Sequence, residues 1–133
     1  MRILALDHGE ARAGAAISDP TETIARPLGI VEPPDPEAVR RLAEEHRAEL
    51  IVVGLPVSLS GEEGEQAARA REFATSLAGF GIPVETFDER LTTRLADSTA
   101  RAGASAPPDA LAAAHLLESY LQRRSGAARE GTP

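Results

Sequence analysis

Cysteine and lysine are both absent from this chain of 133 residues. Without cysteine, the chain cannot form disulfides, thiolate zinc sites or a thiol nucleophile. Without lysine, all 14 basic residues are arginine, whose planar guanidinium grips phosphate with two parallel hydrogen bonds. Any phosphate-binding surface of this protein must therefore use arginine as its cation.

Aromatic residues and long apolar runs are scarce. With three phenylalanines, one tyrosine and no tryptophan, a base-stacking platform for single strands is not expected. No apolar run approaches the length that spans a bilayer, and the first strand follows Met1 and Arg2 directly, which leaves no room for a signal peptide. We therefore expect a cytoplasmic protein without a membrane partner.

The charge and composition are those of a globular domain with an acidic balance. A net charge of −7 argues against indiscriminate nucleic-acid binding, which needs a basic face, but it allows a local arginine patch. Hydrophobic residues at 42% are enough for one core. We predict a single domain over residues 1–124 and a disordered tail over residues 125–133, which are small and polar.

The chain is organised around its first strand. Residues 3–6 are apolar without a break, and Asp7 follows them where a core strand reaches the surface. Gly9 then permits a tight turn or the close approach of a ligand. An ionised carboxylate at such a place needs compensation, either by turn hydrogen bonds or by a metal ion or phosphate-bearing substrate. The segment alone leaves both interpretations open.

The pattern of the remaining chain predicts an α/β fold. Strands are expected at residues 3–7, 13–18, 23–31, 49–56 and 83–89, and helices at residues 36–47, 65–77, 92–102 and 109–123. The first three strands form an antiparallel meander, with Pro27 placing the third at an edge or a bulge. The last two follow helical crossovers and are parallel. The result is a five-stranded mixed sheet flanked by helices, with its ligand crevice at the carboxyl ends of the central strands.

Acidic residues lie at the ends of two predicted strands and at the start of a predicted helix. Asp7 ends the first strand, Asp88 and Glu89 end the last, and Asp109 opens the final helix. Asp88 and Asp109 each have an ordinary role open to them as helix caps. Adjacent strand residues face opposite ways, so Asp88 and Glu89 point inward together only if the strand has already ended. A cluster of carboxylates selects Mg²⁺ or Mn²⁺ and suits phosphodiester hydrolysis.

Four blocks of residues, taken in order, resemble the RuvX/YqgF family over residues 2 to about 122. The blocks are Asp7-His8-Gly9 with Arg12 and Gly14; Val53-Gly54-Leu55-Pro56; Asp88-Glu89-Arg90-Leu91-Thr92-Thr93; and Asp109 with Ala112-Ala113 and Leu116-Leu117-Glu118-Ser119-Tyr120-Leu121. The resemblance implies a ribonuclease H-like fold related to the RuvC resolvase. It also implies a nuclease that resolves Holliday junctions or trims the 5′ end of precursor 16S ribosomal RNA.

Roles for single residues follow from the same resemblance. It implies Asp7, Glu89 and Asp109 as catalytic acids that bind one or two Mg²⁺ or Mn²⁺ ions, with Asp88 as a further candidate. Arg12 and Arg90 fit phosphate contacts. His8 stands where the family usually has an apolar residue, and it either assists the ion or a water molecule, or packs against a neighbour.

Three hypotheses about function stay open on the sequence alone. The first is a metal-dependent endonuclease for branched DNA or precursor ribosomal RNA, acting as a homodimer on a two-fold symmetric junction. The second is a phosphate-binding module of the actin-like type, because Asp-X-Gly after a first strand resembles the phosphate loop of actin and sugar kinases. The other common phosphate-binding loop, Gly-X-X-X-X-Gly-Lys-Ser/Thr, is absent from the sequence. The third is a ribosome-assembly factor that binds RNA without cleaving it.

Overall fold

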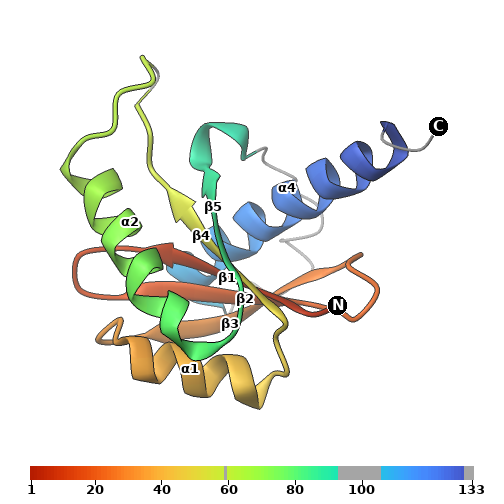
Figure 1. Cartoon of the computed structure of the whole chain (residues 1–133), viewed down its shortest axis with the longest axis horizontal. Coiled ribbons are helices and arrows are strands. Elements are labelled where there is room, and N and C mark those ends of the chain that lie inside the picture. Colours follow the sequence, from red (N-terminus) through yellow and green to blue (C-terminus); the bar gives the residue numbers. More distant parts are fainter. Residues whose placement is uncertain (59, 93–105, 131–133) are drawn as a thin grey trace.

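The computed structural model describes residues 1–58, 60–92 and 106–130, and within them it shows one mixed sheet of five strands (Figure 1). The strand order is β3-β2-β1-β4-β5. The strands are β1 (Ile3–His8), β2 (Ala13–Ser18), β3 (Ala25–Val31), β4 (Leu50–Leu55) and β5 (Val84–Asp88). β1, β2 and β3 pair antiparallel, whereas β4 pairs parallel to both β1 and β5. The predicted fold class and meander are confirmed.

The proline in the third strand has the predicted effect. β3 lies at the edge of the sheet, and its register to β2 shifts between Ala15 and Ala16, where Pro27 is the partner of Ala16. Proline lacks an N–H for the ladder, so it is tolerated at such an edge or bulge. The strand is two residues shorter than expected, beginning at Ala25.

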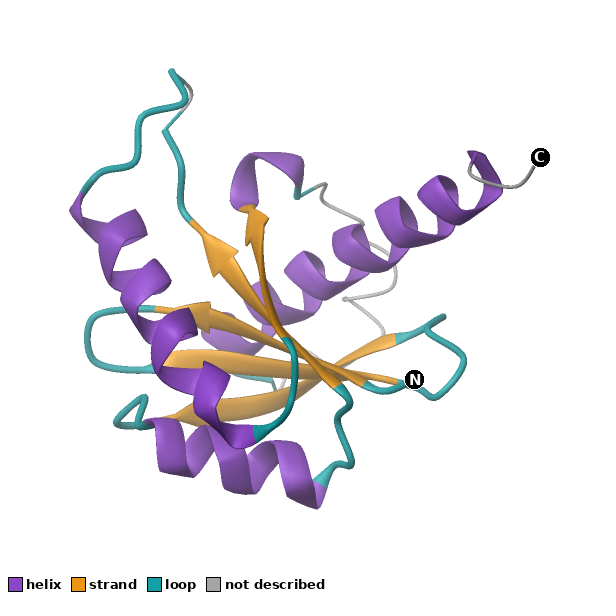
Figure 2. Ribbon diagram, in the orientation of Figure 1, coloured by secondary structure: helices purple, strands orange, loops and turns teal. Residues whose placement is uncertain are grey.

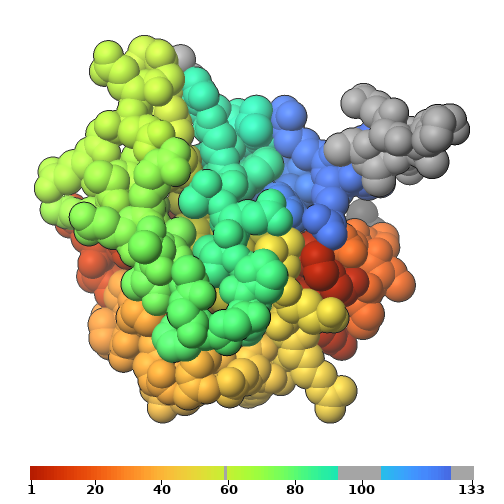
Figure 3. Space-filling view, viewed as in Figure 1, coloured from red at the N-terminus to blue at the C-terminus, as the bar shows by residue number. Residues whose placement is uncertain are grey.

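Helices cover both faces of the sheet (Figure 2). On one face lie α1 (Pro36–Glu45) and α2 (Glu65–Leu77), which stand side by side in Figure 3. Asp35 caps α1 by accepting a hydrogen bond from the Glu37 N–H, as its position before a first-turn proline predicts. α2 has the predicted bounds and continues into a short 3₁₀ turn, η1 (Ala78–Phe80).

The opposite face is covered by α4 (Pro108–Glu130), which packs on β1, β2 and β3. The sequence predicted that this helix ends near residue 123. It continues to Glu130, and Arg124 Nε lies 2.6 Å from Glu22 Oε1, in the turn between β2 and β3, which joins this part of the helix to the sheet. None of the described helices combines the length and apolarity that crossing a bilayer requires.

Side-chain alternation along β1 fills a core on each side of the sheet. Leu4 and Leu6 pack beneath α1 and α2, and Ile3 and Ala5 pack beneath α4. Asp7 continues the second series, so it faces the α4 side at the carboxyl end of the strand. Most of the helix predicted at residues 92–102 lies in residues 93–105, outside the described part of the chain.

Candidate active site

The carboxyl ends of β1, β4 and β5 lie side by side at one end of the sheet, because these neighbouring strands are parallel (Figure 1). Asp7 lies near the end of β1, and Glu89 directly follows β5. A pocket of about 230 Å³ opens at this edge, and both carboxyl groups line it. This is where an open α/β sheet is expected to bind a ligand.

Glycine stands on both sides of Asp7. Gly14 is its partner on β2, and Gly54 lies on β4, the strand at its other side. A Cβ at Gly14 would lie 1.9 Å from the backbone oxygen of Asp109, and a Cβ at Gly54 would lie 2.9 Å from Glu89 Oε1. Because glycine has no side chain, Gly14 leaves room for the first turn of α4 on one side of Asp7. Gly54 leaves room for the Glu89 carboxyl on the other side.

Asp7 and Glu89 form a hydrogen-bonded carboxyl pair. Burial, the hydrogen bond to Asp7 and the negative charges of Asp7 and Asp88 raise the pKa of Glu89 to about 8. The protonated form of Glu89 is therefore favoured at neutral pH when no cation is bound. β5 ends at Asp88 and Glu89 begins the 3₁₀ turn η2 (Glu89–Leu91), so strand alternation no longer limits where Glu89 points.

This pair has the chemistry of a divalent-cation site. Two partly buried carboxyl groups in one pocket offer oxygen ligands whose negative charge Mg²⁺ or Mn²⁺ would compensate once Glu89 has released its proton. Across residues 1–58, 60–92 and 106–130, however, no group of three acidic, histidine or cysteine side chains is arranged around one ion position. Within the described residues, this place therefore offers the carboxyl oxygens of two side chains, Asp7 and Glu89.

Asp109 lies close to the pair in the fold but binds another partner. Its backbone packs on Gly14, beside Asp7, while its carboxylate Oδ2 lies 2.7 Å from Arg12 Nε. The sequence predicted that Asp109 would share an ion with Asp7 and Glu89. The structure brings Asp7 and Glu89 together and leaves Asp109 in an ion pair with Arg12, the arginine predicted to contact phosphate.

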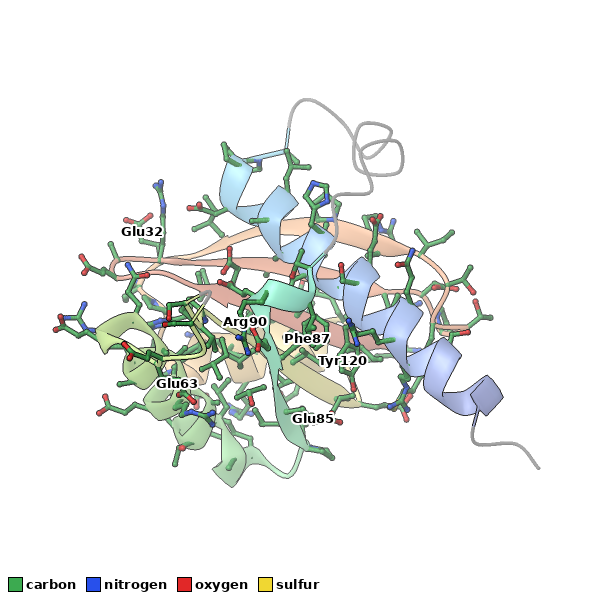
Figure 4. The ribbon with its side chains drawn as sticks, turned by 90° about the horizontal axis from the view of Figure 1, so that it is seen from above. Glu32, Glu63, Glu85, Phe87, Arg90 and Tyr120 are labelled. Atoms are coloured by element: carbon green, nitrogen blue, oxygen red, sulfur yellow. The ribbon has the colours of Figure 1, made fainter. Side chains whose placement is uncertain are left out.

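Asp88 and Arg90 bind each other. Asp88 caps η2 by accepting a hydrogen bond from the Arg90 N–H at 2.9 Å, and its carboxylate also lies 2.6 Å from Arg90 Nη2. These bonds to Arg90 lower the pKa of Asp88. The capping role considered from the sequence accounts for Asp88, whose carboxylate is not among the groups that line the pocket. Figure 4 shows Arg90 above the end of β5.

His8 and Gly9 also line the pocket. The His8 ring stacks on Phe73 of α2, with ring centroids 4.6 Å apart. Burial lowers the pKa of His8; the Asp7 charge opposes this, and the Arg69 charge adds to it. The Gly9 N–H donates to the Arg12 carbonyl at 2.8 Å, which closes the β1–β2 turn as expected. The packing interpretation of His8 therefore describes its main contact.

Sequence reasoning missed several residues of this pocket. Glu10 lines it from the β1–β2 turn and Pro56 from the loop that follows β4. Gln66 and Arg69 line it from α2. The helical periodicity of α2 marks Arg69 as a solvent-facing position, and only the packing of α2 beside the β1–β2 turn brings it to the site. A larger hollow of about 440 Å³ lies between β3 and α1 and contains none of the predicted site residues.

The family model described as "RuvX: Holliday junction resolvase" matches residues 1–123. The chain belongs to the RuvX family. Relatives agree: a protein of Rubrobacter xylanophilus named "Putative pre-16S rRNA nuclease" is 43% identical, over 95% of this chain and 96% of its own length. One of Chloroflexus aurantiacus with the same name is 41% identical, over 92% of this chain and 87% of its own length.

Solved structures confirm the ribonuclease H-like fold. Thermus thermophilus RuvC in complex with a Holliday junction substrate superposes with a TM-score of 0.66 at 16% identity, covering 99% of this chain and 97% of that one. The Fowlpox virus resolvase with its junction DNA superposes with a TM-score of 0.58 at 12% identity, covering 93% of this chain and 99% of that one.

Of the four blocks of residues that resemble the RuvX family, the first three contribute residues to the pocket, including Asp7, Pro56 and Glu89.

Proposed function

We propose that this RuvX-family protein is a divalent-metal-dependent endonuclease that hydrolyses phosphodiester bonds in structured nucleic acid. The observation that carries the proposal is the Asp7–Glu89 pair, two carboxyl groups that line one pocket at the carboxyl ends of parallel strands. Family membership supports it, because the family model is described as a resolvase and the relatives carry the name of a ribosomal RNA nuclease.

Asp7 and Glu89 would hold the ion through their carboxylate oxygens. Bound Mg²⁺ or Mn²⁺ supplies Lewis acidity to the scissile phosphate and lowers the pKa of the attacking water. The protein supplies the geometry: Gly54 leaves room for the Glu89 carboxyl, and η2 aims it at Asp7. Glu89 must release its proton to ligate the ion, so ion binding is expected to be coupled to proton release.

Asp109 is proposed as the third acid. Its backbone already lies beside Asp7, against Gly14, and its side chain is 40% exposed. An exposed ion pair of this kind is worth about 1 kcal/mol or less, so exchanging Arg12 for a cation costs little. In that exchange Arg12 becomes available to a substrate phosphate, which is the role the sequence predicted for it.

The substrate is proposed to be a four-way DNA junction, precursor 16S ribosomal RNA, or both. On a junction with two-fold symmetry the protein would act as a homodimer in the cytoplasm, each copy cleaving one strand. We further propose that residues 1–124 form the single nuclease domain. Symmetric paired nicks identify a resolvase, whereas a cut confined to the ribosomal precursor identifies the RNA-processing enzyme.

A side-by-side cleavage assay tests this function. The purified protein is incubated with each substrate in Mg²⁺, in Mn²⁺ and in EDTA, with Asp7→Asn as the matched inactive variant. We expect cleavage of at least one substrate, dependent on the metal and reduced at least about 100-fold in Asp7→Asn, since each such acid acts on the transition state. Cleavage in EDTA, or full activity of Asp7→Asn, would contradict the proposal.

A further inference from the structure

Among the described residues that line the pocket, Arg69 alone carries a guanidinium group. It reaches the pocket from the second turn of α2. Its Nη1 donates to Glu10 Oε1 at 2.9 Å, and its Nη2 donates to Glu65 Oε1 at 2.7 Å. Glu10 belongs to the β1–β2 turn and Glu65 begins α2, so the arginine bridges two elements at the pocket rim.

The ion pairs of Arg69 with Glu10 and Glu65 contribute little to the stability of the fold, so stability does not explain why Arg69 lies at the pocket. The Arg69 side chain is 42% exposed, and its partners Glu10 and Glu65 are 73% and 79% exposed. Ion pairs as open as these contribute about 0.2–1 kcal/mol, and salt weakens them further. The two bonds use two of the five N–H groups of a guanidinium, so donors remain for another ligand.

Arg12 and Arg90, the arginines predicted from the sequence to contact phosphate, are less well placed than Arg69 to bind a phosphate in the pocket. Arg90 is bound by Asp88 through its backbone N–H, Nε and Nη2, which ties it to the cap of η2. Arg12 is bound to Asp109, and neither Arg12 nor Arg90 is among the residues that line the pocket. Arg69 lines the same pocket as Asp7 and Glu89, where the proposed nuclease would hold the scissile phosphate.

We propose that Arg69 binds a phosphate of the substrate strand next to the Asp7–Glu89 pair, exchanging its bonds to Glu10 and Glu65 for bonds to phosphate oxygens. The proposal rests on the nuclease function above and names the residue that positions its substrate. A phosphodiester offers the guanidinium two oxygens in a geometry that a fork of N–H groups matches. Glu10 is then a competitor, which holds Arg69 until nucleic acid arrives.

The test measures nucleic-acid affinity in EDTA, where binding is separated from cleavage, on the full chain with both junction DNA and the ribosomal precursor. Arg69→Ala is expected to weaken binding about 10-fold or more, as loss of a charge-assisted hydrogen bond does. It should also lower the slope of log affinity against log salt by about 0.7–0.9, one phosphate contact. Arg69→Lys, which keeps the charge but not the fork, should lie between wild type and Arg69→Ala.

Arg71 is the matched control, because it lies on the same helix and is also ion-paired, to Glu63, but does not line the pocket. Arg71→Ala should bind within about 2-fold of wild type. Glu10→Gln should tighten binding several-fold by freeing Arg69, and this gain should vanish in the Arg69→Ala background, a coupling that a general charge effect does not produce.

Two outcomes would overturn the assignment: equal effects of Arg69→Ala and Arg71→Ala, or a gain from Glu10→Gln that persists without Arg69. Either result leaves the proposed nuclease function standing if the wild type still cleaves. Conversely, loss of binding in Arg69→Ala together with a wild type that never cleaves would support the phosphate contact and count against the nuclease.

Discussion

Replacing Glu89 by glutamine tests the shared proton directly. With a pKa of about 8 in the folded protein against an ordinary 4.5, Glu89 binds a proton in the folded state that the unfolded chain releases between these two pH values. The folded state then holds more protons than the unfolded state, so the free energy of unfolding must fall as pH rises from about 4.5 to 8. Glutamine removes this dependence while keeping the size and a hydrogen-bond donor for Asp7.

The size of the effect follows from the same two values. Their difference corresponds to about 5 kcal/mol if nothing screens the charges. Because Glu89 lines a pocket open to water, we expect about 1–2 kcal/mol. In EDTA, the Glu89→Gln variant should equal wild type near pH 5 and exceed it by that amount at pH 9.

Urea unfolding at pH steps from 5 to 9 measures this difference. The pKa of His8 is lowered by burial, but His8 is present in both proteins and its contribution to the pH dependence largely cancels. Glu62→Gln, a change in an exposed loop, is the control and should follow the wild-type curve. Parallel curves for wild type and Glu89→Gln would show that the two carboxyl groups do not share a proton, and would refute the reasoning.

Three further substitutions test other parts of the site and its support. Asp109→Asn should fold normally, since the side chain lies in the first turn of α4 and loses only an exposed ion pair with Arg12, and it should lose cleavage; full activity would remove Asp109 from the catalytic set. Gly14→Ala should cost about 3 kcal/mol in urea unfolding by driving a Cβ into the Asp109 backbone, whereas Gly79→Ala, with open space around it, should change stability by under about 1 kcal/mol; equal costs would contradict this. Tyr120→Phe should cost about 1 kcal/mol by removing the hydroxyl that donates to Glu85 at 3.1 Å, and no loss would mean that water replaces this bond; both residues are labelled in Figure 4.

Periodicity and turn chemistry predicted most of the scaffold. The unbroken apolar run of β1 predicted a strand buried on both faces, and strict alternation then set the face of Asp7. The N-cap at Asp35 and the glycines after α2 marked helix ends that the structure reproduces within about two residues. These features depend on neighbours in the sequence, so a single sequence can reveal them.

Contacts between distant residues were harder to predict. Arg124 of α4, for example, forms an ion pair with Glu22, about a hundred residues away. The structure pairs Asp109 with Arg12, whereas the resemblance implied a cation shared with Asp7, and nothing in the sequence decides between the two. Arg69 occupies an ordinary surface position of α2, and its place in the pocket depends on how α2 docks beside the β1–β2 turn.

Calorimetric titration of the protein with Mn²⁺ at pH 7, in two buffers of different ionisation enthalpy, tests most directly whether Asp7 and Glu89 bind one cation together. If they do, binding should release about 0.9 proton per ion, the fraction held by a group with a pKa of about 8. Glu89→Gln should then bind more weakly and release almost none. Absence of Mn²⁺ binding, or binding that releases no proton from the wild-type protein, would contradict the account.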